Sequence, residues 1–160
     1  VVDYALRRKK ELDGRRVWVT GYANNAPCYI PSERVLKEGG YEGGGAMIYT
    51  SSGAASGAAP WQVAYPMTKN AIHALARHVA SRWGKQGIRA NVICPGLVLT
   101  EAVKQHLTDE YVEKGLKAVP HVRLGQPDDI AGAVAFLASS DGEWVNGQVW
   151  HVNGGAQMRD

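Results

Sequence analysis

The chain has few cysteines and no long apolar run, and these absences exclude several classes of protein. Its 160 residues contain only Cys28 and Cys94, which are too few for a disulfide framework and lack metal-ligand spacing. No apolar stretch approaches the length of a membrane span, and the N-terminus has no apolar signal-peptide core. We therefore expect a reduced, cytoplasmic protein that does not contact membranes.

Histidines and basic residues also form no pattern that indicates a binding site. The five histidines lack ligand spacing, so we expect no metal. A basic run at residues 7–10 is typical of a solvated helix face, and no interleaved aromatic and basic residues indicate nucleic acid. With 45% hydrophobic residues the chain has enough apolar material for one core, which predicts a single domain over residues 1–160.

From Ala46 onward, short apolar runs alternate with helical patterns. The runs are AMIYTSS, IRANVICPG and QVWHVNGG, each typical of a buried strand. Between them lie a strong helix over Tyr65–Trp83, a helix or helix pair over Glu101–Lys117 and a helix start at Gln126–Asp129, whereas residues 53–59 indicate a loop. This order predicts an α/β fold with a doubly wound parallel sheet and helices on both faces.

The stretch from Ser51 to Lys69 carries the residues with the clearest chemistry. On a helix, Tyr65 and Lys69 project from one face because they are four residues apart. A lysine ammonium beside a phenol stabilises the phenolate, which makes Tyr65 a candidate general acid/base. Ser52 ends a predicted strand and is placed to donate a hydrogen bond to the same substrate oxygen. Each residue alone also has an ordinary structural interpretation, such as a half-buried tyrosine or a turn serine.

Together with two later motifs, these residues resemble the second half of the short-chain dehydrogenase/reductase family. The later motifs are the run Asn91–Thr100 (NVICPGLVLT) and the pair Asn146-Gly147-Gln148 and Val152-Asn153-Gly154-Gly155. The similarity covers about residues 46–156. It implies a Rossmann-like sheet that is incomplete at its N-terminal half. It also implies an NAD(P)-dependent oxidoreductase that interconverts a secondary alcohol and a ketone of a small-molecule substrate.

The resemblance implies a role for each residue of the catalytic set. Tyr65 would exchange a proton with the substrate oxygen while a nicotinamide exchanges hydride with the attached carbon. Lys69 would hold the nicotinamide ribose and favour the tyrosine phenolate, and Ser52 would orient the carbonyl. The asparagine that completes the family's set has only Asn24 and Asn25 as candidates.

The resemblance also implies a wall for the nicotinamide. Pro95 and Gly96 would shape this wall, and the backbone of Val98 with the hydroxyl of Thr100 would bind the carboxamide. Thr100 before Glu101 is equally a credible helix N-cap, and Asn91 is expected to tie backbone together behind the site. The sequence does not distinguish NAD from NADP, and it does not identify the substrate.

The glycine-rich turn with which the family should begin, Gly-x-x-x-Gly-x-Gly, is absent. Two placements of residues 1–45 are open. In one, residues 16–21 (RVWVTG) form the first strand and its turn. In the other, which we favour, Leu12–Gly21 leads into the central helix and Asn24–Leu36 continues it.

Two explanations of the missing half also stay open. Either stretches of the protein are missing between the residues numbered 1–45, or the chain is a truncated subunit. In the second case the alternative function is a catalytically silent partner that stabilises an intact homologue. An epimerase or dehydratase fits less well, because little sequence follows Gly155 to make a substrate domain. Family habit implies a homo-oligomer, either a dimer or a tetramer.

Overall fold

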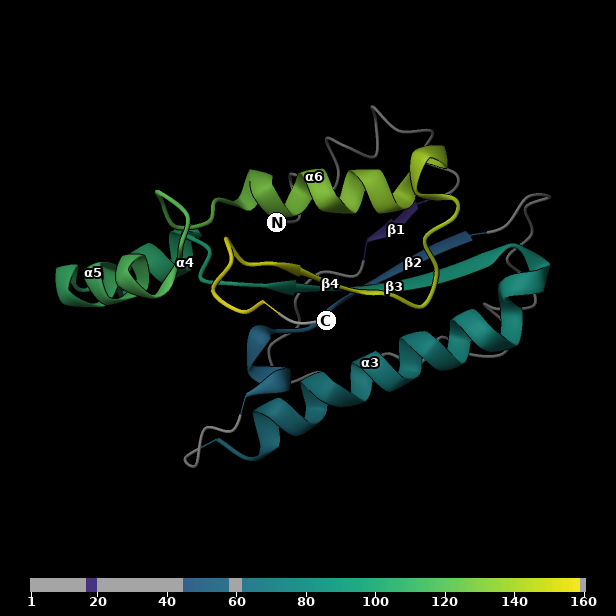
Figure 1. Cartoon of the computed structure of the whole chain (residues 1–160), viewed down its shortest axis with the longest axis horizontal. Coiled ribbons are helices and arrows are strands. Elements are labelled where there is room, and N and C mark those ends of the chain that lie inside the picture. The colour runs from purple at the N-terminus through teal and green to yellow at the C-terminus, as the bar shows by residue number, and fades with distance from the viewer. Residues whose placement is uncertain (1–16, 20–44, 58–61, 159–160) are drawn as a thin grey trace.

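The computed structural model of the chain describes residues 17–19, 45–57 and 62–158. Within these residues, four parallel strands form one sheet in chain order (Figure 1). The strands are β1 (Val17–Val19), β2 (Gly45–Thr50), β3 (Ile88–Pro95) and β4 (Val149–Val152). The three apolar runs that the sequence singles out are therefore the parallel strands β2, β3 and β4, as predicted.

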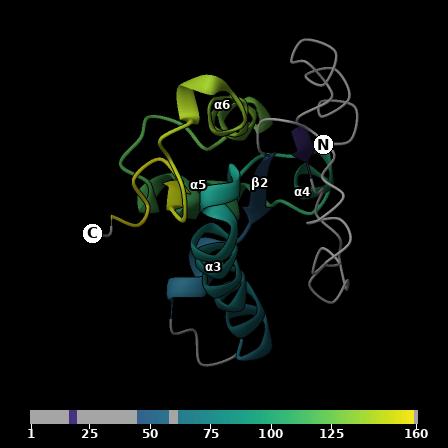
Figure 2. The same ribbon diagram turned by 90° about the vertical axis from the view of Figure 1, so that its right-hand side faces the viewer.

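Helices cover both faces of the sheet. They are α3 (Ala64–Trp83), α4 (Glu101–Lys104), α5 (Asp109–Ala118) and α6 (Pro127–Ala138). Helix α3 lies on one face and α6 on the other, whereas α4 and α5 lie beyond the ends of the strands (Figures 1 and 2). This arrangement confirms the predicted doubly wound α/β fold, and α4 with α5 is the predicted helix pair.

Alternate residues of β3 divide the core into two layers. Ala90, Val92 and Cys94 pack against Ala76 and Val79 of α3, and all five side chains are buried. Because successive side chains of a strand point to opposite faces, the residues between them face the other helix.

On that second face, Ile48 of β2 and Ile93 of β3 pack against Leu137 of α6. The apolar run of β3 is continuous because both of its faces are covered, as expected for a parallel strand inside a sheet.

The structure corrects the sequence interpretation at two places. Val17–Val19 pairs with β2 as a strand, so the favoured placement of Leu12–Gly21 as the lead into a helix is wrong at these residues. Valine and tryptophan favour pleated backbone, which agrees with the alternative strand placement. Gly53–Ser56 is a short 3₁₀ helix, η1, inside the predicted loop, because Ser52 caps it. The other parts of both placements of residues 1–45 lie outside the described residues.

Asn91 ties the sheet to the turn before β4. Its side chain is 1% exposed, donates to the Val145 carbonyl at 2.8 Å and accepts from the Gln148 amide at 2.9 Å. A second asparagine, Asn146, accepts from the Ala90 amide at 2.8 Å. These bonds satisfy backbone groups that neighbouring strands leave unpaired, and they confirm that Asn91 ties backbone together.

Arg89 closes the C-terminal end of α6. Its guanidinium donates to the carbonyls of Leu137 at 2.8 Å and Gly142 at 2.9 Å, and to that of Ser139 at 3.3 Å. The last carbonyls of a helix have no partner within the helix and carry partial negative charge. A cation placed there donates hydrogen bonds to these carbonyls and also compensates the charge. One side chain of β3 therefore anchors the helix that covers the adjacent face.

Replacing Arg89 by methionine should lower the free energy of unfolding by about 2 kcal/mol or more. The loss follows because several carbonyls lose a charged donor together. Urea unfolding of Arg89→Met beside Arg77→Met measures it, since Arg77 is exposed on α3 and its removal should change stability by less than about 0.5 kcal/mol. Equal stability of the two variants would show that Arg89 does not anchor α6.

Candidate active site

The carboxyl ends of the strands bring the predicted residues to one edge of the sheet. Ser52 is the second residue after β2, and Pro95 is the last residue of β3. In open parallel sheets this edge is where ligands bind. The oxygen of Ser52 accepts from the Ala54 amide at 3.2 Å, which caps η1. Because a hydroxyl also has one proton to donate, this cap leaves Ser52 a donor.

Tyr65 and Lys69 lie on the first turns of α3 and are close to each other. The Lys69 Nζ is 5.7 Å from the centroid of the Tyr65 ring and donates to the Thr50 carbonyl at 3.1 Å. Tyr65 is 38% exposed, so a ligand has access to its ring. The structure therefore brings together the two residues that the four-residue spacing pairs, and it places the ammonium at the end of β2.

A buried polar cluster that the sequence does not reveal lies beneath this pair. Ser51 donates to the Lys69 carbonyl at 3.0 Å, and the His73 Nε2 is 2.8 Å from the Ser51 oxygen. Since the serine proton goes to the carbonyl, the imidazole N–H is the donor in the second bond. Cys94 of β3 brings its sulfur to 3.5 Å from the same nitrogen. The cluster links β2, β3 and α3 under the candidate site.

The members of this cluster are uncharged at neutral pH. Burial, followed by the charges of Arg77 and His151, lowers the pKa of His73 from its ordinary 6.5. Burial raises the pKa of the Cys94 thiol. Neutral groups cost less to bury than charged ones, so Ser51, His73 and Cys94 form a structural connection. The sequence places His73 one helical turn after Lys69, but this spacing does not pair His73 with Ser51 or Cys94.

The segment after β3 approaches the end of β4 very closely. The Gly96 amide donates to the Val152 carbonyl at 3.1 Å, and a Cβ on Gly96 would lie 2.9 Å from the Cα of Asn153. Only glycine allows this approach. Next along the chain, Val98 forms a parallel bridge with Gly125.

Thr100 is the N-cap of α4. Its side-chain oxygen accepts from the Val103 amide at 3.2 Å, so the N-cap interpretation of this residue is confirmed. The cap uses the oxygen and leaves the hydroxyl proton as a donor, so the cap is compatible with a binding role. Among the described residues, no group of three or more His, Cys, Asp or Glu side chains is placed to hold a metal ion.

The chain matches known proteins over most of its length. The sequence model of the family described as Enoyl-(Acyl carrier protein) reductase matches residues 25–157. The 7α-hydroxysteroid dehydrogenase of Escherichia coli is 40% identical over 124 residues, which cover 78% of this chain and 49% of the relative. The chain belongs to the short-chain dehydrogenase/reductase family.

Solved structures of this family agree with the fold. A 7α-hydroxysteroid dehydrogenase with NADH and 7-oxo glycochenodeoxycholic acid has a TM-score of 0.66 and 42% identity, over 71% of this chain and 44% of that one. A gluconate 5-dehydrogenase from Burkholderia cenocepacia with NADP and tartrate has a TM-score of 0.64 and 34% identity, over 70% and 44%. This chain corresponds to the C-terminal part of the family and spans about half the length of the curated relatives it matches.

Some predicted features of a short-chain dehydrogenase/reductase lie outside the described residues. They include both candidates for the family's asparagine, Asn24 and Asn25; Cys28 also lies outside the described residues. In the described part of the chain, no helix is long and apolar enough to cross a membrane.

His73 should make stability depend on pH. Its pKa in the folded chain lies below the unfolded value, so it contributes stability that is present above about pH 6.5 and is lost as the pH falls toward the folded pKa. The free energy of unfolding of His73→Gln should therefore fall less steeply between pH 7.5 and 5 than that of the wild type. The two slopes should differ by at most about 1.4 kcal/mol per pH unit.

Urea unfolding at several pH values measures these slopes. His78→Gln is the matched control, because His78 is exposed on the same helix, and it should keep the wild-type slope. If His73→Gln also kept that slope, His73 would not be the titrating group.

Proposed function

We propose that this chain carries the catalytic centre of an NAD(P)-dependent oxidoreductase that interconverts a secondary alcohol and a ketone. The observation that supports it most is the placement of the Lys69 ammonium. It is anchored on the Thr50 carbonyl at 3.1 Å and lies 5.7 Å from the centroid of the Tyr65 ring. A cation held beside a phenol favours the phenolate, which is the form that accepts a proton from an alcohol.

The three side chains take complementary roles in the proposed reaction. In the reductive direction, Tyr65 donates its phenolic proton to the substrate oxygen as the C=O bond becomes a C–O–H group. Ser52 donates a hydrogen bond to the same oxygen and stabilises the negative charge that develops there. Lys69 stabilises the phenolate that Tyr65 becomes. In the oxidative direction Tyr65 takes the proton back.

The proposed cofactor is NAD or NADP, as in the related structures that contain NADH or NADP. When bound, the nicotinamide supplies or accepts the hydride. The donor set of the chain fits it, because the Lys69 ammonium, the Thr100 hydroxyl proton and backbone groups near Val98 all suit ribose and carboxamide oxygens. Pro95 and Gly96 would form the wall beside the ring.

The substrate proposed for the site is a small molecule that carries a ketone or a secondary alcohol. One related structure contains 7-oxo glycochenodeoxycholic acid, which makes this compound a reasonable first substrate to test. Assembly into a dimer or tetramer and a cytoplasmic location stay predictions. Neither the described contacts nor the comparisons favour the silent-subunit alternative.

Replacing Tyr65 by phenylalanine should lower kcat by about a hundredfold or more, because the proton donor is lost. The measurement is turnover of a panel of ketones that includes 7-oxo glycochenodeoxycholic acid, with NADH and with NADPH. Tyr49→Phe removes a phenol from β2 that, within the described residues, donates to the Met47 sulfur at 3.4 Å, so it should retain wild-type turnover. Normal turnover by Tyr65→Phe would refute the assigned role.

Dinucleotide binding separates the proposed enzyme from a silent subunit. Titration of the complete purified chain with NADH and NADPH should change the nicotinamide fluorescence with at least one of them. Lys69→Met should weaken this binding, since the ammonium would contact the ribose. A flat titration with both dinucleotides would contradict the proposed function and leave the silent subunit as the alternative.

A further inference from the structure

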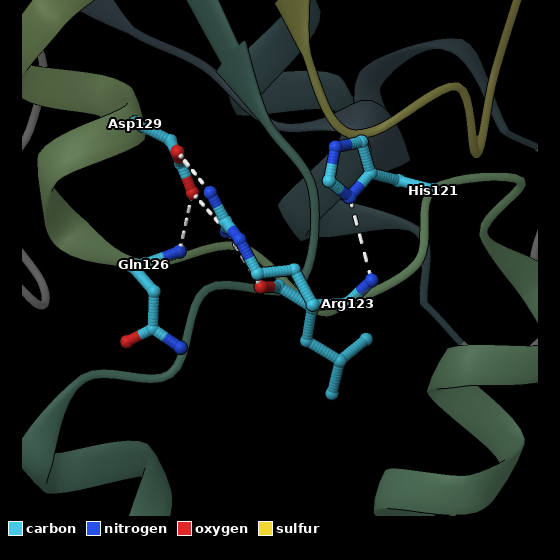
Figure 3. Close-up of polar contacts among 5 residues, drawn as sticks. His121, Arg123, Gln126 and Asp129 are labelled. Carbon is cyan, nitrogen blue, oxygen red and sulfur yellow. Dashed lines mark hydrogen bonds and ion pairs between the residues drawn. The ribbon is translucent and has the colours of Figure 1, made fainter.

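A bidentate ion pair joins the start of α6 to the connection that precedes it. The two guanidinium nitrogens of Arg123 lie 2.7 and 2.8 Å from the two carboxylate oxygens of Asp129 (Figure 3). Paired parallel hydrogen bonds of this kind fix orientation as well as distance. The two residues are part of the surface, with side chains 49% and 34% exposed, so solvent weakens their attraction and geometry is their main contribution.

The same two residues hold the backbone on both sides of Gly125. Asp129 accepts from the backbone amide of Gln126 at 2.7 Å, and Arg123 donates to the Leu124 carbonyl at 3.0 Å. The bonds from Arg123 and then the Gln126 amide hold the pKa of the Asp129 carboxyl well below its usual range, so the pair persists at physiological pH. Gly125 is thus fixed from its preceding and following residues.

Gly125 in turn forms backbone hydrogen bonds with the residues on both sides of Val98. Its amide donates to the Leu97 carbonyl at 3.1 Å, and its carbonyl accepts from the Leu99 amide at 2.8 Å, so Val98 lies between two bonds to one residue. A Cβ on Gly125 would lie 3.1 Å from the Leu97 carbonyl oxygen. The contact is therefore close, and a displacement of Gly125 displaces the backbone of Val98.

The connection is also tied to the end of β4. The His121 amide donates to the Gly154 carbonyl at 3.2 Å. Gly96, Val98 and Gly154 line one cavity of about 310 Å³ together with Arg123 and Asp129. The ion pair and the backbone that it fixes therefore belong to one structural unit at the carboxyl edge of the sheet.

We propose that Arg123 and Asp129 are positioning residues that set the backbone of Val98 through Gly125, and so set where the nicotinamide carboxamide is bound. The inference rests on the proposed function for the identity of the ligand, but the mechanical link from the ion pair to Val98 does not. The simpler alternative is that Asp129 only stabilises the N-terminus of α6.

Asp128 separates these two roles because it is the neighbouring acid in the same first turn of α6. It is exposed, and its carboxylate makes no hydrogen bond or ion pair with the described part of the chain. Asp128→Asn and Asp129→Asn remove the same charge from the same helix end, where both carboxylates favour the helix dipole. Only Asp129→Asn weakens the link to Gly125.

The first measurement is amide hydrogen exchange of the full chain without ligand. In Asp129→Asn the Leu99 and Gly125 amides should exchange roughly three- to tenfold faster, because the bonds between them open more often. Asp128→Asn should leave both unchanged, and the Val92 amide, which donates to the Gln148 carbonyl, should exchange at the wild-type rate in both variants. Unchanged exchange at Leu99 and Gly125 in Asp129→Asn would overturn the proposal.

Should Asp129→Asn fail to fold, Arg123→Lys takes its place. It keeps the positive charge at residue 123 and the hydrogen bond that the Gln126 backbone amide donates to Asp129, but it loses the bidentate geometry. The expected result is again faster exchange at Leu99 and Gly125, and unchanged exchange again overturns the proposal.

The second measurement is binding of NADH and NADPH by the folded variants. Asp129→Asn should raise the Kd of the dinucleotide about threefold or more relative to Asp128→Asn. With a dinucleotide that carries deuterium on one face of the nicotinamide ring, the variant should also transfer deuterium with less selectivity for that face. Wild-type affinity and selectivity in Asp129→Asn, despite faster exchange, would overturn the link to the carboxamide. Absence of binding by the wild type would instead refute the proposed function, and hydrogen exchange alone would then decide whether the ion pair sets Val98.

Discussion

The hydrogen bond from the Lys69 ammonium to the Thr50 carbonyl is the interaction on which the candidate site depends. It joins the last residue of β2 to the second turn of α3, and so fixes the height of the helix relative to the edge of the sheet. Ser51 reinforces this junction by donating to the carbonyl of the same lysine at 3.0 Å. Lys69 is thus held at its ammonium and at its backbone carbonyl, and these two bonds leave little freedom for the helix to slide or rotate. Tyr65, one turn earlier, takes its position from that constraint.

The rest of the fold keeps this edge in place mainly through side chains that bond to backbone. Arg89 and Asn91 lie two residues apart on β3. Arg89 donates to the carbonyls of Leu137 in α6 and of Gly142 after it. Asn91 donates to the Val145 carbonyl before β4. Apolar packing on the two faces supplies most of the cohesion, but it is non-directional and does not fix register. Buried hydrogen bonds do, because an unpaired buried carbonyl or amide is costly. The hydrogen bonds of Asn91 and Arg89 thus help to fix the positions of the strands whose carboxyl ends form the candidate site.

Local patterns in the sequence predict the parts of this structure that depend on neighbours along the chain. The apolar runs identify β2, β3 and β4, and the four-residue spacing pairs Tyr65 with Lys69, because helix and strand periods alone decide these features. The contact between Ser51 and His73 joins residues 22 positions apart, so no local period encodes it. The contact of Gly125 with Val98 is equally unpredictable from the sequence, because α4 and α5 lie between the two residues and no local pattern fixes how the chain returns. From the sequence, the strand Val17–Val19 is one of two open placements, and the other placement is favoured, because so short an apolar run does not by itself identify the strand with which it pairs.

Cys94 gives the folded chain an internal reporter. Its thiol is fully buried between α3 and the sheet, and only a thiolate exposed to solvent reacts with an alkylating reagent. Labelling at Cys94 therefore requires α3 to separate from β3, and its rate counts how often that separation occurs. If the label on Cys94 is measured separately from that on Cys28, the packing of α3 on the sheet beneath Tyr65 and Lys69 is followed chemically without a ligand.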